Sequence, residues 1–310
     1  MITARNLRKT YGDVEAVKGL SFDVQAGQVV GLLGPNGAGK TTTINMLATL
    51  VPIDEGSASI GGFDVATRPE QVRQIIGLAG QSAAVDEKLT TRENLELFGR
   101  LYKIPRSQRR RRIDELIERF DMADFADRVA GSYSGGQRRR LDVVAALVAD
   151  PPALFLDEPT AGLDPRSRAA LWDTIVQLAA RGTAIVLTTQ YLDEADRLAD
   201  EVLIIDRGTV IASGTPDSLK RNLQQDVLEV HVGDPGQAVE CLGSIDGLVV
   251  DEEVRSIGVP VGADAAASLE VLQRLQACGV SIEDFQLRRP TLDDVFLALT
   301  GATTHEDAPA

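Results

Sequence analysis

The chain has 310 residues, enough for one large or two ordinary domains, and its 44% hydrophobic and 25% charged residues are typical of a globular protein. The formal net charge of −14 excludes the long-range positive field that attracts nucleic acid. The longest apolar stretch, Val143–Ala149, is far shorter than the roughly 20 residues that span a bilayer. A function at a membrane would therefore require a partner that crosses it.

Cysteine content and the N-terminus indicate a cytoplasmic setting. The two cysteines, Cys241 and Cys278, are too few for a disulfide framework or a metal cluster, so we expect two small unpaired side chains in a reducing compartment. Residues 1–7 contain no apolar run and do not form a secretory signal.

The first 150 residues change from a strand pattern to a helix pattern. Residues 1–27 predict short strands, because single apolar residues are separated by polar residues and glycines. Residues 29–33 form an apolar run between two glycines and predict a buried strand, followed by a helix over Lys40–Leu50. From about 85 to 150, apolar residues recur at spacings of three, four and seven, which indicates helices.

Three further short apolar runs occur at 153–156, 184–187 and 202–205. Short apolar strands that alternate with helices indicate a parallel sheet buried on both faces.

The composition changes near residue 225, and a second, smaller pattern follows. The expected elements are strand, helix, strand, strand, helix and strand, at 227–232, 238–242, 248–254, 256–261, 265–278 and 280–287. This order predicts a small split β-α-β domain of ferredoxin-like type. A last helix is expected at 292–299. The predicted domains are 1–225, with a helical part at about 82–152, then 226–301, then a disordered tail at 302–310.

A glycine-rich stretch lies between the strand at 29–33 and the helix that follows it. It consists of Gly34, Pro35, Asn36, Gly37, Ala38, Gly39, Lys40, Thr41 and Thr42, which match the phosphate-binding pattern G-x-x-x-x-G-K-[ST]. Glycines let backbone N–H groups converge on phosphate oxygens, and the helix N-terminus adds positive partial charge. We expect Lys40 to reach the β- and γ-phosphates and the Thr41 hydroxyl to bind Mg²⁺.

Two carboxylates, Asp157 and Glu158, follow the apolar run at 153–156. Alone, such a pair is most often a solvated strand end. After a phosphate-binding loop, Asp157 suits the Mg²⁺ shell and Glu158 suits a general base that polarises the attacking water.

A second helix N-terminus begins with Ser134, Gly135, Gly136 and Gln137, and its bare amides form another anion site. The order of phosphate loop, Tyr-Ser-Gly-Gly-Gln and Asp-Glu resembles an ABC-type ATPase over residues 1–225. The resemblance implies a P-loop NTPase fold of ABC type, with an N-terminal antiparallel β part and an inserted helical subdomain, followed by the small α+β domain. It also implies an enzyme that hydrolyses ATP.

Further residues match the family's motifs by position. Tyr11 resembles the aromatic residue that stacks on adenine, although it could be an ordinary surface tyrosine. Gln81 resembles the glutamine that touches Mg²⁺ and senses the membrane partner, and residues 161–164 resemble the loop that crosses the dimer interface. The family packs two copies head to tail around ATP, so Ser134 and Gly136 would bind the γ-phosphate held by the partner subunit.

The chain departs from the family at Gln190, where a histidine is usual. Its two histidines, His231 and His305, lie beyond the ATPase domain. A glutamine amide can donate a hydrogen bond to a γ-phosphate oxygen but cannot become cationic, so we expect weaker transition-state stabilisation. The runs at 188–196 and 290–301 are similar to the daunorubicin/doxorubicin-resistance branch, which implies a homodimer at the cytoplasmic face of the membrane. The subunits would bind a separate permease and power export of drug-like or lipid-like molecules.

Two other functions stay open at this stage. One is a soluble ABC ATPase that acts on ribosomes or DNA-repair complexes, although those usually carry two cassettes or long insertions. The other is a non-hydrolysing regulatory module, which the presence of Lys40, Asp157 and Glu158 disfavours. A basic run at Arg109–Arg112 is interpreted as a solvated helix face, or alternatively as a contact for anionic headgroups.

Overall fold

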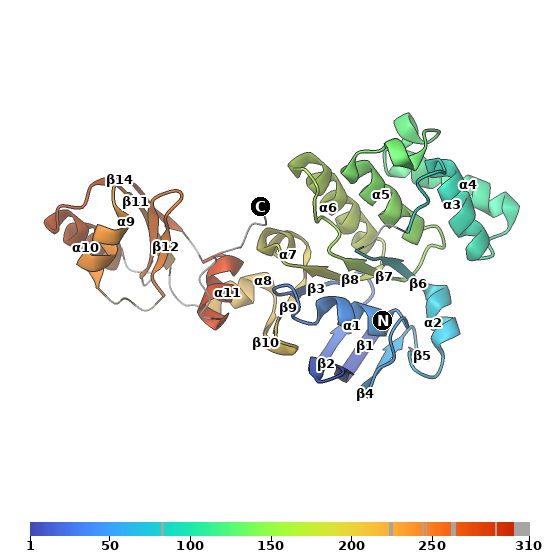
Figure 1. The fold of residues 1–310 in the computed structure, drawn as a ribbon, viewed down its shortest axis with the longest axis horizontal. Coiled ribbons are helices and arrows are strands. Elements are labelled where there is room, and N and C mark those ends of the chain that lie inside the picture. The colour runs from blue at the N-terminus through green and yellow to red at the C-terminus, as the bar shows by residue number, and fades with distance from the viewer. Residues whose placement is uncertain are drawn as a thin grey trace. The chain divides into compact units, whose positions relative to one another are not determined.

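The computed structural model describes residues 1–81, 84–222, 226–243, 245, 247–261, 265–288 and 290–300 (Figure 1). Contacts within the chain divide it into two compact units, Met1–Gly214 and Thr215–Ala310. Each unit is described by itself below. The tail that was expected to be disordered lies outside the described residues.

The first unit is built on a six-stranded sheet in the order β10-β9-β3-β8-β7-β6. The strands are β3 (Val29–Leu33), β6 (Ile76–Ala79), β7 (Ala153–Asp157), β8 (Ala184–Thr189), β9 (Glu201–Asp206) and β10 (Thr209–Gly214). All neighbours pair in parallel except β10, which pairs antiparallel with β9. Every residue of β3, β7 and β8 is buried, which confirms the predicted parallel sheet covered on both faces.

Two hydrophobic cores lie on opposite faces of this sheet. Leu154 and Leu156 of β7 belong to one core, whereas Ala153 and Phe155 belong to the other. Because side chains alternate along a strand, one strand supplies both cores. The first core includes residues of the helices α5 (Gly135–Ala146) and α6 (Pro165–Ala180), and the second includes residues of α1 (Lys40–Leu47).

A second, antiparallel sheet covers α1, in the order β2-β1-β4-β5. Its strands are β1 (Ile2–Tyr11), β2 (Val14–Val24), β4 (Glu55–Ile60) and β5 (Phe63–Asp64), followed by helix α2 (Pro69–Ile75). This sheet confirms the expected N-terminal antiparallel part. Helix α1 ends three residues earlier than predicted, because Thr49 adopts a left-handed conformation with φ of 63°.

The helical part of the first unit is inserted between β6 and β7. It contains α3 (Thr91–Leu101), α4 (Arg106–Arg119), two short 3₁₀ helices, η1 (Ala123–Phe125) and η2 (Ala130–Ser132), and then α5. The buried Tyr133 hydroxyl lies 2.7 Å from the Thr91 hydroxyl and 2.8 Å from the Phe125 carbonyl oxygen. These contacts fix the segment that immediately precedes α5. Helix α7 (Leu192–Leu198) follows β8 and packs against β3.

The second unit contains a four-stranded antiparallel sheet in the order β12-β13-β11-β14. Its elements are α8 (Pro216–Asn222), β11 (Asp226–Val232), α9 (Pro235–Leu242), β12 (Val249–Asp251), β13 (Ser256–Val261), α10 (Ala265–Ala277), β14 (Ile282–Arg288) and α11 (Leu292–Thr300). The sequence of β11 to β14 is the predicted split β-α-β arrangement. Strand β12 is shorter than predicted, because residues 252–255 form the turn into β13.

The expectation of two unpaired cysteines is wrong. Cys241 on α9 and Cys278 after α10 form a disulfide, with Cα atoms 6.1 Å apart and a sequence separation of 37 residues. The two helices lie side by side against the sheet, which brings the two residues together. A pairing that depends on tertiary packing has no local sequence signal.

Within the described ranges, no helix is long and apolar enough to span a bilayer.

Candidate functional site

The glycine-rich loop connects β3 to α1 and passes close to backbone from other segments. A Cβ atom on Gly34 would lie 2.1 Å from the Ile205 carbonyl oxygen, and one on Gly39 would lie 2.4 Å from the Ala16 carbonyl oxygen. Gly39 also has a φ of 101°, which favours glycine. The close packing therefore requires glycine at both ends of the loop.

Lys40 is the first residue of α1, and only 4% of its surface is exposed. Its ammonium donates hydrogen bonds to the carbonyl oxygens of Gly34 (2.6 Å) and Pro35 (3.0 Å), and it lies 3.7 Å from a Glu158 carboxylate oxygen. Burial lowers the pKa of Lys40, while the carboxylates of Glu158 and Asp157 oppose that shift. The ammonium is thus held inside the loop, where phosphate oxygens would be stronger, charge-assisted acceptors.

Three oxygen-bearing side chains converge beside Lys40 from different segments. The Thr41 hydroxyl donates to Asp157 Oδ1 at 3.1 Å, and the Gln81 amide donates to the Thr41 hydroxyl at 3.2 Å. No trio of His, Cys, Asp or Glu within the described ranges could hold a metal ion by itself. The oxygen donors here nevertheless fit Mg²⁺, which binds through one or two protein oxygens together with phosphate oxygens and water.

Glu158 follows β7 in an unusual backbone conformation, with φ of 47°. Its backbone N–H donates to the Thr188 hydroxyl (3.0 Å) and lies 3.2 Å from the Thr188 carbonyl oxygen. The same hydroxyl donates to Asp157 at 2.5 Å, so Thr188 fixes both acidic residues. A left-handed non-glycine residue that its neighbours hold in place is a frequent feature of functional sites.

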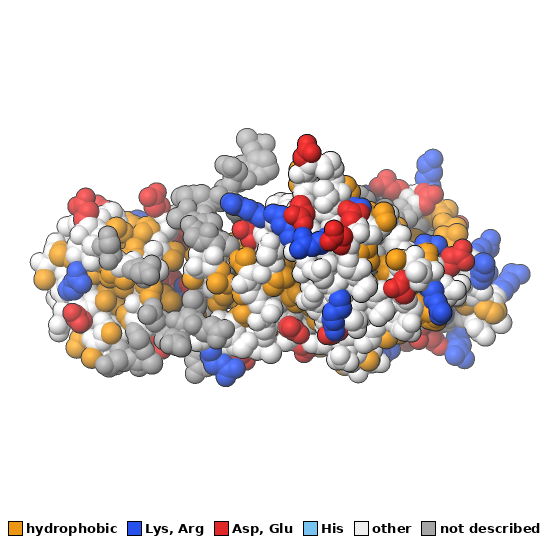
Figure 2. Space-filling model, turned by 90° about the horizontal axis from the view of Figure 1, so that it is seen from below, with side chains coloured by type: hydrophobic (Ala, Val, Ile, Leu, Met, Phe, Trp, Pro, Cys, Tyr) orange, Lys and Arg blue, Asp and Glu red, His pale blue; other side chains and the backbone are white. Residues whose placement is uncertain are grey.

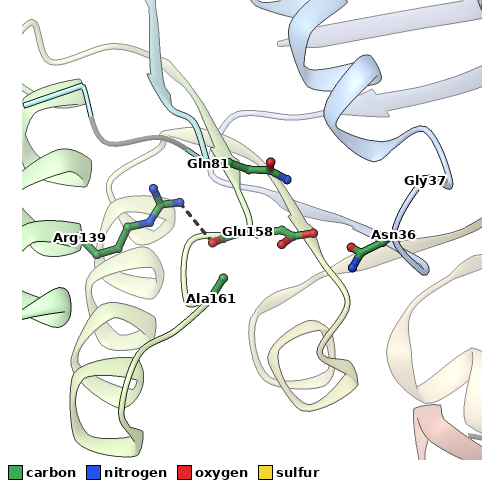
Figure 3. A pocket seen from close by; sticks show the side chains of 6 residues that line it. All are labelled: Asn36, Gly37, Gln81, Arg139, Glu158 and Ala161. Carbon is green, nitrogen blue, oxygen red and sulfur yellow. Dashed lines mark hydrogen bonds between the residues drawn. The ribbon is translucent and has the colours of Figure 1, made fainter. Parts of the chain in front are cut away.

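The Glu158 side chain lines a pocket of about 540 Å³ together with Asn36, Gly37, Gln81, Arg139 and Ala161. Figure 3 shows Gln81 and Glu158 between the phosphate loop on one side and Arg139 of α5 on the other. The pocket therefore joins the loop, the strand-end carboxylate and the glutamine into one site.

Arg139 belongs to the basic run Arg138–Arg140, for which the sequence predicts a contact with the nucleotide or the dimer but no role for any single residue. Its guanidinium donates to the carbonyl oxygens of Asp157 (2.8 Å), Glu158 (3.2 Å), Pro159 (2.9 Å) and Gly80 (2.5 Å). It also pairs with Asp142 at 3.2 Å. Arg139 thereby ties the start of the Gln81 segment to the backbone around Glu158. Its position, two residues after the Ser-Gly-Gly-Gln turn, is the signal that could have indicated it.

Ser134 and Gln137 begin α5 as a reciprocal capping box. The Ser134 hydroxyl accepts from the Gln137 backbone N–H (3.2 Å), and the Gln137 side chain accepts from the Ser134 N–H (3.1 Å). A Cβ atom on Gly136 would lie 2.3 Å from the Ser167 hydroxyl, whereas one on Gly135 would meet nothing within 4 Å. These residues do not line the pocket of their own chain.

Tyr11 and Gln190, two further predicted site residues, are likewise not among the residues that line the pocket. Tyr11 ends β1 with 48% of its surface exposed, and the Lys9 ammonium lies 5.5 Å from its ring centroid. Gln190 is partly buried directly after β8, where the Gly34 N–H lies 3.4 Å from the Thr189 carbonyl oxygen. Gln190 therefore follows a residue that contacts the start of the phosphate loop.

A phosphate-binding loop, a strand-end Asp-Glu pair and an inserted helical part with a Ser-Gly-Gly-Gln turn define an ABC-type ATP-binding cassette, which is an ATPase. The family model described as "ABC transporter" matches residues 17–161. The C-terminal domain model of DrrA1-3-like ATP-binding proteins matches residues 214–300.

The relatives include daunorubicin resistance ATP-binding protein DrrA2 of Streptomyces coeruleorubidus, which is 49% identical over 98% of this chain and 96% of its own length. Daunorubicin/doxorubicin resistance ATP-binding protein DrrA of Streptomyces peucetius is 45% identical over 97% of this chain and 92% of its own length. Linearmycin resistance ATP-binding protein LnrL of Bacillus subtilis is 34% identical over 99% of this chain and 100% of its own length. The chain therefore belongs to the ABC transporter ATP-binding proteins, in the daunorubicin/doxorubicin-resistance branch.

Solved structures agree on the cassette. An ATP-binding subunit of an ABC transporter matches with a TM-score of 0.65 and 31% identity, over 72% of this chain and 92% of that chain. A dimeric cassette bound to ADP and Pi in a post-hydrolysis state matches with a TM-score of 0.63 and 25% identity, over 69% and 98% of the two chains.

Proposed function

We propose that two copies of this chain close on two MgATP at the cytoplasmic face of a membrane. There they power export of a hydrophobic drug-like or lipid-like molecule through a separate permease. The observation that carries the proposal is the set of contacts that joins Lys40 to Glu158, which lines the pocket, and Thr41 to Asp157, in a chain of the resistance branch.

Within one subunit, each polar group has a distinct task in ATP hydrolysis. The loop amides and Lys40 would bind the phosphates, and Thr41, Asp157 and Gln81 would hold Mg²⁺, which neutralises charge on the phosphate oxygens. Glu158 would orient the attacking water and accept its proton while the bond from the γ-phosphorus to ADP breaks. Arg139 keeps the Glu158 backbone in place for this step.

The dimer would explain why the Ser134 turn does not line the pocket of its own chain. Its helix N-terminus leaves Gly135 open to an approaching anion, and the γ-phosphate of the partner's ATP is such an anion. Loss of that phosphate on hydrolysis would weaken the closed pair and let it open. A dimeric cassette among the similar structures supports this arrangement.

Export of a drug-like or lipid-like molecule is supported by the names of the relatives. They include daunorubicin and linearmycin resistance proteins and Nod factor export ATP-binding protein I of Burkholderia lata, which is 43% identical over 76% of this chain. The alternative of a soluble ABC ATPase finds no counterpart among these relatives.

The test of the ATPase mechanism is Glu158→Gln, which removes the base and preserves the side-chain shape. We expect ATP binding to persist, turnover to fall about 10²–10⁴-fold, and the ATP-bound dimer to accumulate in size-exclusion chromatography. Glu70→Gln on the exposed face of α2 is the matched control and should behave as the parent chain. Full activity of Glu158→Gln would overturn the assignment of the base.

The test of the transporter proposal is affinity purification from detergent-solubilised membranes of the native host. We expect a multispanning membrane protein in stoichiometric amount. Copurification of ribosomal or DNA-repair proteins alone, after crosslinking, would leave the ATPase assignment standing and contradict the transporter.

A further inference from the structure

The basic run at the start of α4 does not act as a single charged face. Arg109 is buried and pairs with Glu96 at 2.7 Å, so it belongs to the packing of α3 against α4. Arg111 has 84% of its side chain exposed and pairs with Glu115 at 3.1 Å on the same helix. Arg112 lies on a different side of the helix from Arg111, toward the end of α5.

Arg112 lines a surface pocket of about 310 Å³ with two other arginines, Arg119 and Arg181. Arg112 and Arg119 are seven residues apart and therefore share one face of α4. Arg181 is the C-cap residue, directly after α6. Leu116 supplies an apolar wall between them, and the Arg119 guanidinium lies 5.0 Å from the Phe120 ring centroid, which holds it in position.

Two of the arginines that line this pocket have buried guanidinium nitrogens with no hydrogen-bond partner in the part of the chain that the structure describes. These nitrogens are Nε of Arg112 and both Nε and Nη2 of Arg119. Among the described residues, Arg112 donates hydrogen bonds through Nη2 alone, to Asp150 (2.5 Å) and to the Leu147 carbonyl oxygen (3.1 Å). Leaving charged donors buried and unpaired is costly, so such groups normally have an acceptor.

The charge balance at the pocket also favours an anion. Burial, followed by the positive charges of Arg181 and Arg112, lowers the pKa of Arg119, and Asp150 only partly opposes this. Glu115, which also lines the pocket, is paired with Arg111. Because Asp150 pairs with Arg112, the remaining charged residues of the pocket lining are Arg119, Arg181 and the exposed Glu118.

This positive cluster occurs in a chain whose formal net charge is −14. Figure 2 shows basic side chains projecting from the end of the first unit that carries α3 and α4, with acidic side chains among them. The cluster therefore reflects local placement rather than a generally basic surface.

We propose that the pocket of Arg112, Arg119 and Arg181 binds a phosphate-type anion, as a second anion site separate from the nucleotide site. A phosphate group offers several oxygens and more than one negative charge, which suits converging guanidinium forks better than a single carboxylate does. None of the residues that line the nucleotide pocket lines this one. A free phosphate and a phospholipid headgroup share the same chemistry here.

The first experiment measures the melting temperature of the full chain against inorganic phosphate, with the ionic strength held constant by sodium chloride. The variants are Arg119→Gln and Arg181→Gln, and the matched control is Arg111→Gln. We expect the apparent affinity for phosphate to fall about tenfold in Arg119→Gln and about fivefold in Arg181→Gln, with the control unchanged. Phosphate that binds at the nucleotide site should stabilise the parent chain and the three variants equally, so it does not affect the differences between their apparent affinities.

Without phosphate, Arg181→Gln should be at least as stable as the parent chain, because it relieves like-charge repulsion. An arginine with a purely structural role would lower the melting temperature when removed. If Arg119→Gln folds poorly, the exposed Arg181 still provides the test. The proposal is overturned if phosphate does not stabilise the parent chain, or stabilises all four proteins equally.

The second experiment identifies the source of the phosphate by sedimentation with vesicles of phosphatidylcholine, with or without phosphatidylglycerol. Binding to phosphatidylglycerol vesicles by the parent and Arg111→Gln, but not by Arg119→Gln or Arg181→Gln, supports a headgroup in the pocket. If the two variants lose affinity for free phosphate but sediment with the vesicles to the same extent as the parent, the ligand of the pocket is a soluble phosphate. Equal binding of all four proteins to the anionic vesicles would overturn headgroup binding at this pocket.

Discussion

At the scale of single residues, Glu194 is an acidic side chain with no exposed surface. Its Oε1 atom accepts a hydrogen bond from the Trp172 indole at 3.0 Å, and burial raises its pKa above the model-peptide value of 4.5. The folded state therefore binds the proton more tightly than the unfolded state does. The resulting stability is complete below pH 4.5 and is lost as the pH rises through the folded-state pKa.

Glu194→Gln should consequently stabilise the protein at neutral pH, because the amide is uncharged at every pH. Each kcal/mol gained would raise the melting temperature by about 2–4 °C in a domain of this size. The difference from the parent chain should shrink as the pH approaches 4.5. Melting curves between pH 4.5 and 8 measure it, and a variant less stable than the parent at pH 7.5 would contradict the explanation.

Gln190 occupies the position where the family usually has histidine. Its amide can donate a hydrogen bond but carries no positive charge. We expect Gln190→His to raise kcat, because an imidazolium would add positive charge against the γ-phosphate in the transition state. Gln190→Ala should lower kcat by about tenfold, the effect of one modest donor. Steady-state ATPase assays distinguish these outcomes, and an alanine variant with unchanged turnover would remove Gln190 from the site.

The residues that the structure brings together were predictable to different degrees. Lys40, Thr41, Asp157 and Glu158 lie in short motifs whose spacing encodes their chemistry, so the sequence alone indicates them. For Arg139 the sequence offers only its position after the Ser-Gly-Gly-Gln turn, because its contacts are with carbonyl oxygens up to 59 residues away. The burial of Glu194 and the arginine pocket likewise depend on which helices pack against each other in the fold, and the sequence gives no local signal for this.

At the scale of elements, the guanidinium of Arg139 connects α5 to the ends of β6 and β7. Only 9% of Arg139 is exposed, and it shares its buried environment with Asp142, whose pKa is raised by burial. Arg139 is a hydrogen-bond donor to four carbonyl oxygens and to the Asp142 carboxylate, whose other oxygen accepts from the Ala84 N–H at 2.7 Å.

Arg139→Met should therefore destabilise the first unit by roughly 3–5 kcal/mol, the effect of breaking a buried ion pair from one side. Arg138→Met is the matched control, because Arg138 pairs with Glu87 while retaining 33% exposure. We expect the control to change stability by less than about 1 kcal/mol. Urea unfolding gives both values, and similar losses for the two variants would contradict this role for Arg139.

The elements themselves follow closely from local patterns. Strands β3, β7, β8 and β9 are continuous apolar runs because both faces of the sheet are covered, and α3 shows the expected three-and-four spacing. Element ends were less predictable. Strand β12 keeps only three residues, since pairing with β13 decides where it stops.

At the scale of the whole molecule, the two units hold different kinds of stabilising feature. Every residue of the nucleotide site lies within Met1–Gly214, whereas the disulfide lies within Thr215–Ala310. The second unit has a small core of its own, built from β11, β13 and the helices α9 and α10. Small cores gain proportionally more from a covalent link.

Reduction should therefore loosen the second unit and leave the nucleotide site intact. A crosslink between residues 37 apart contributes about 2–4 kcal/mol, mainly by restricting the unfolded chain. We expect dithiothreitol to increase hydrogen exchange in β11 and β13, with exchange in β3 and β7 and the ATPase rate unchanged. Cys241→Ser/Cys278→Ser is the control and should exchange like the reduced protein with or without dithiothreitol. If exchange in β11 is the same before and after reduction, the non-covalent contacts of α9 and α10 are sufficient to hold this unit.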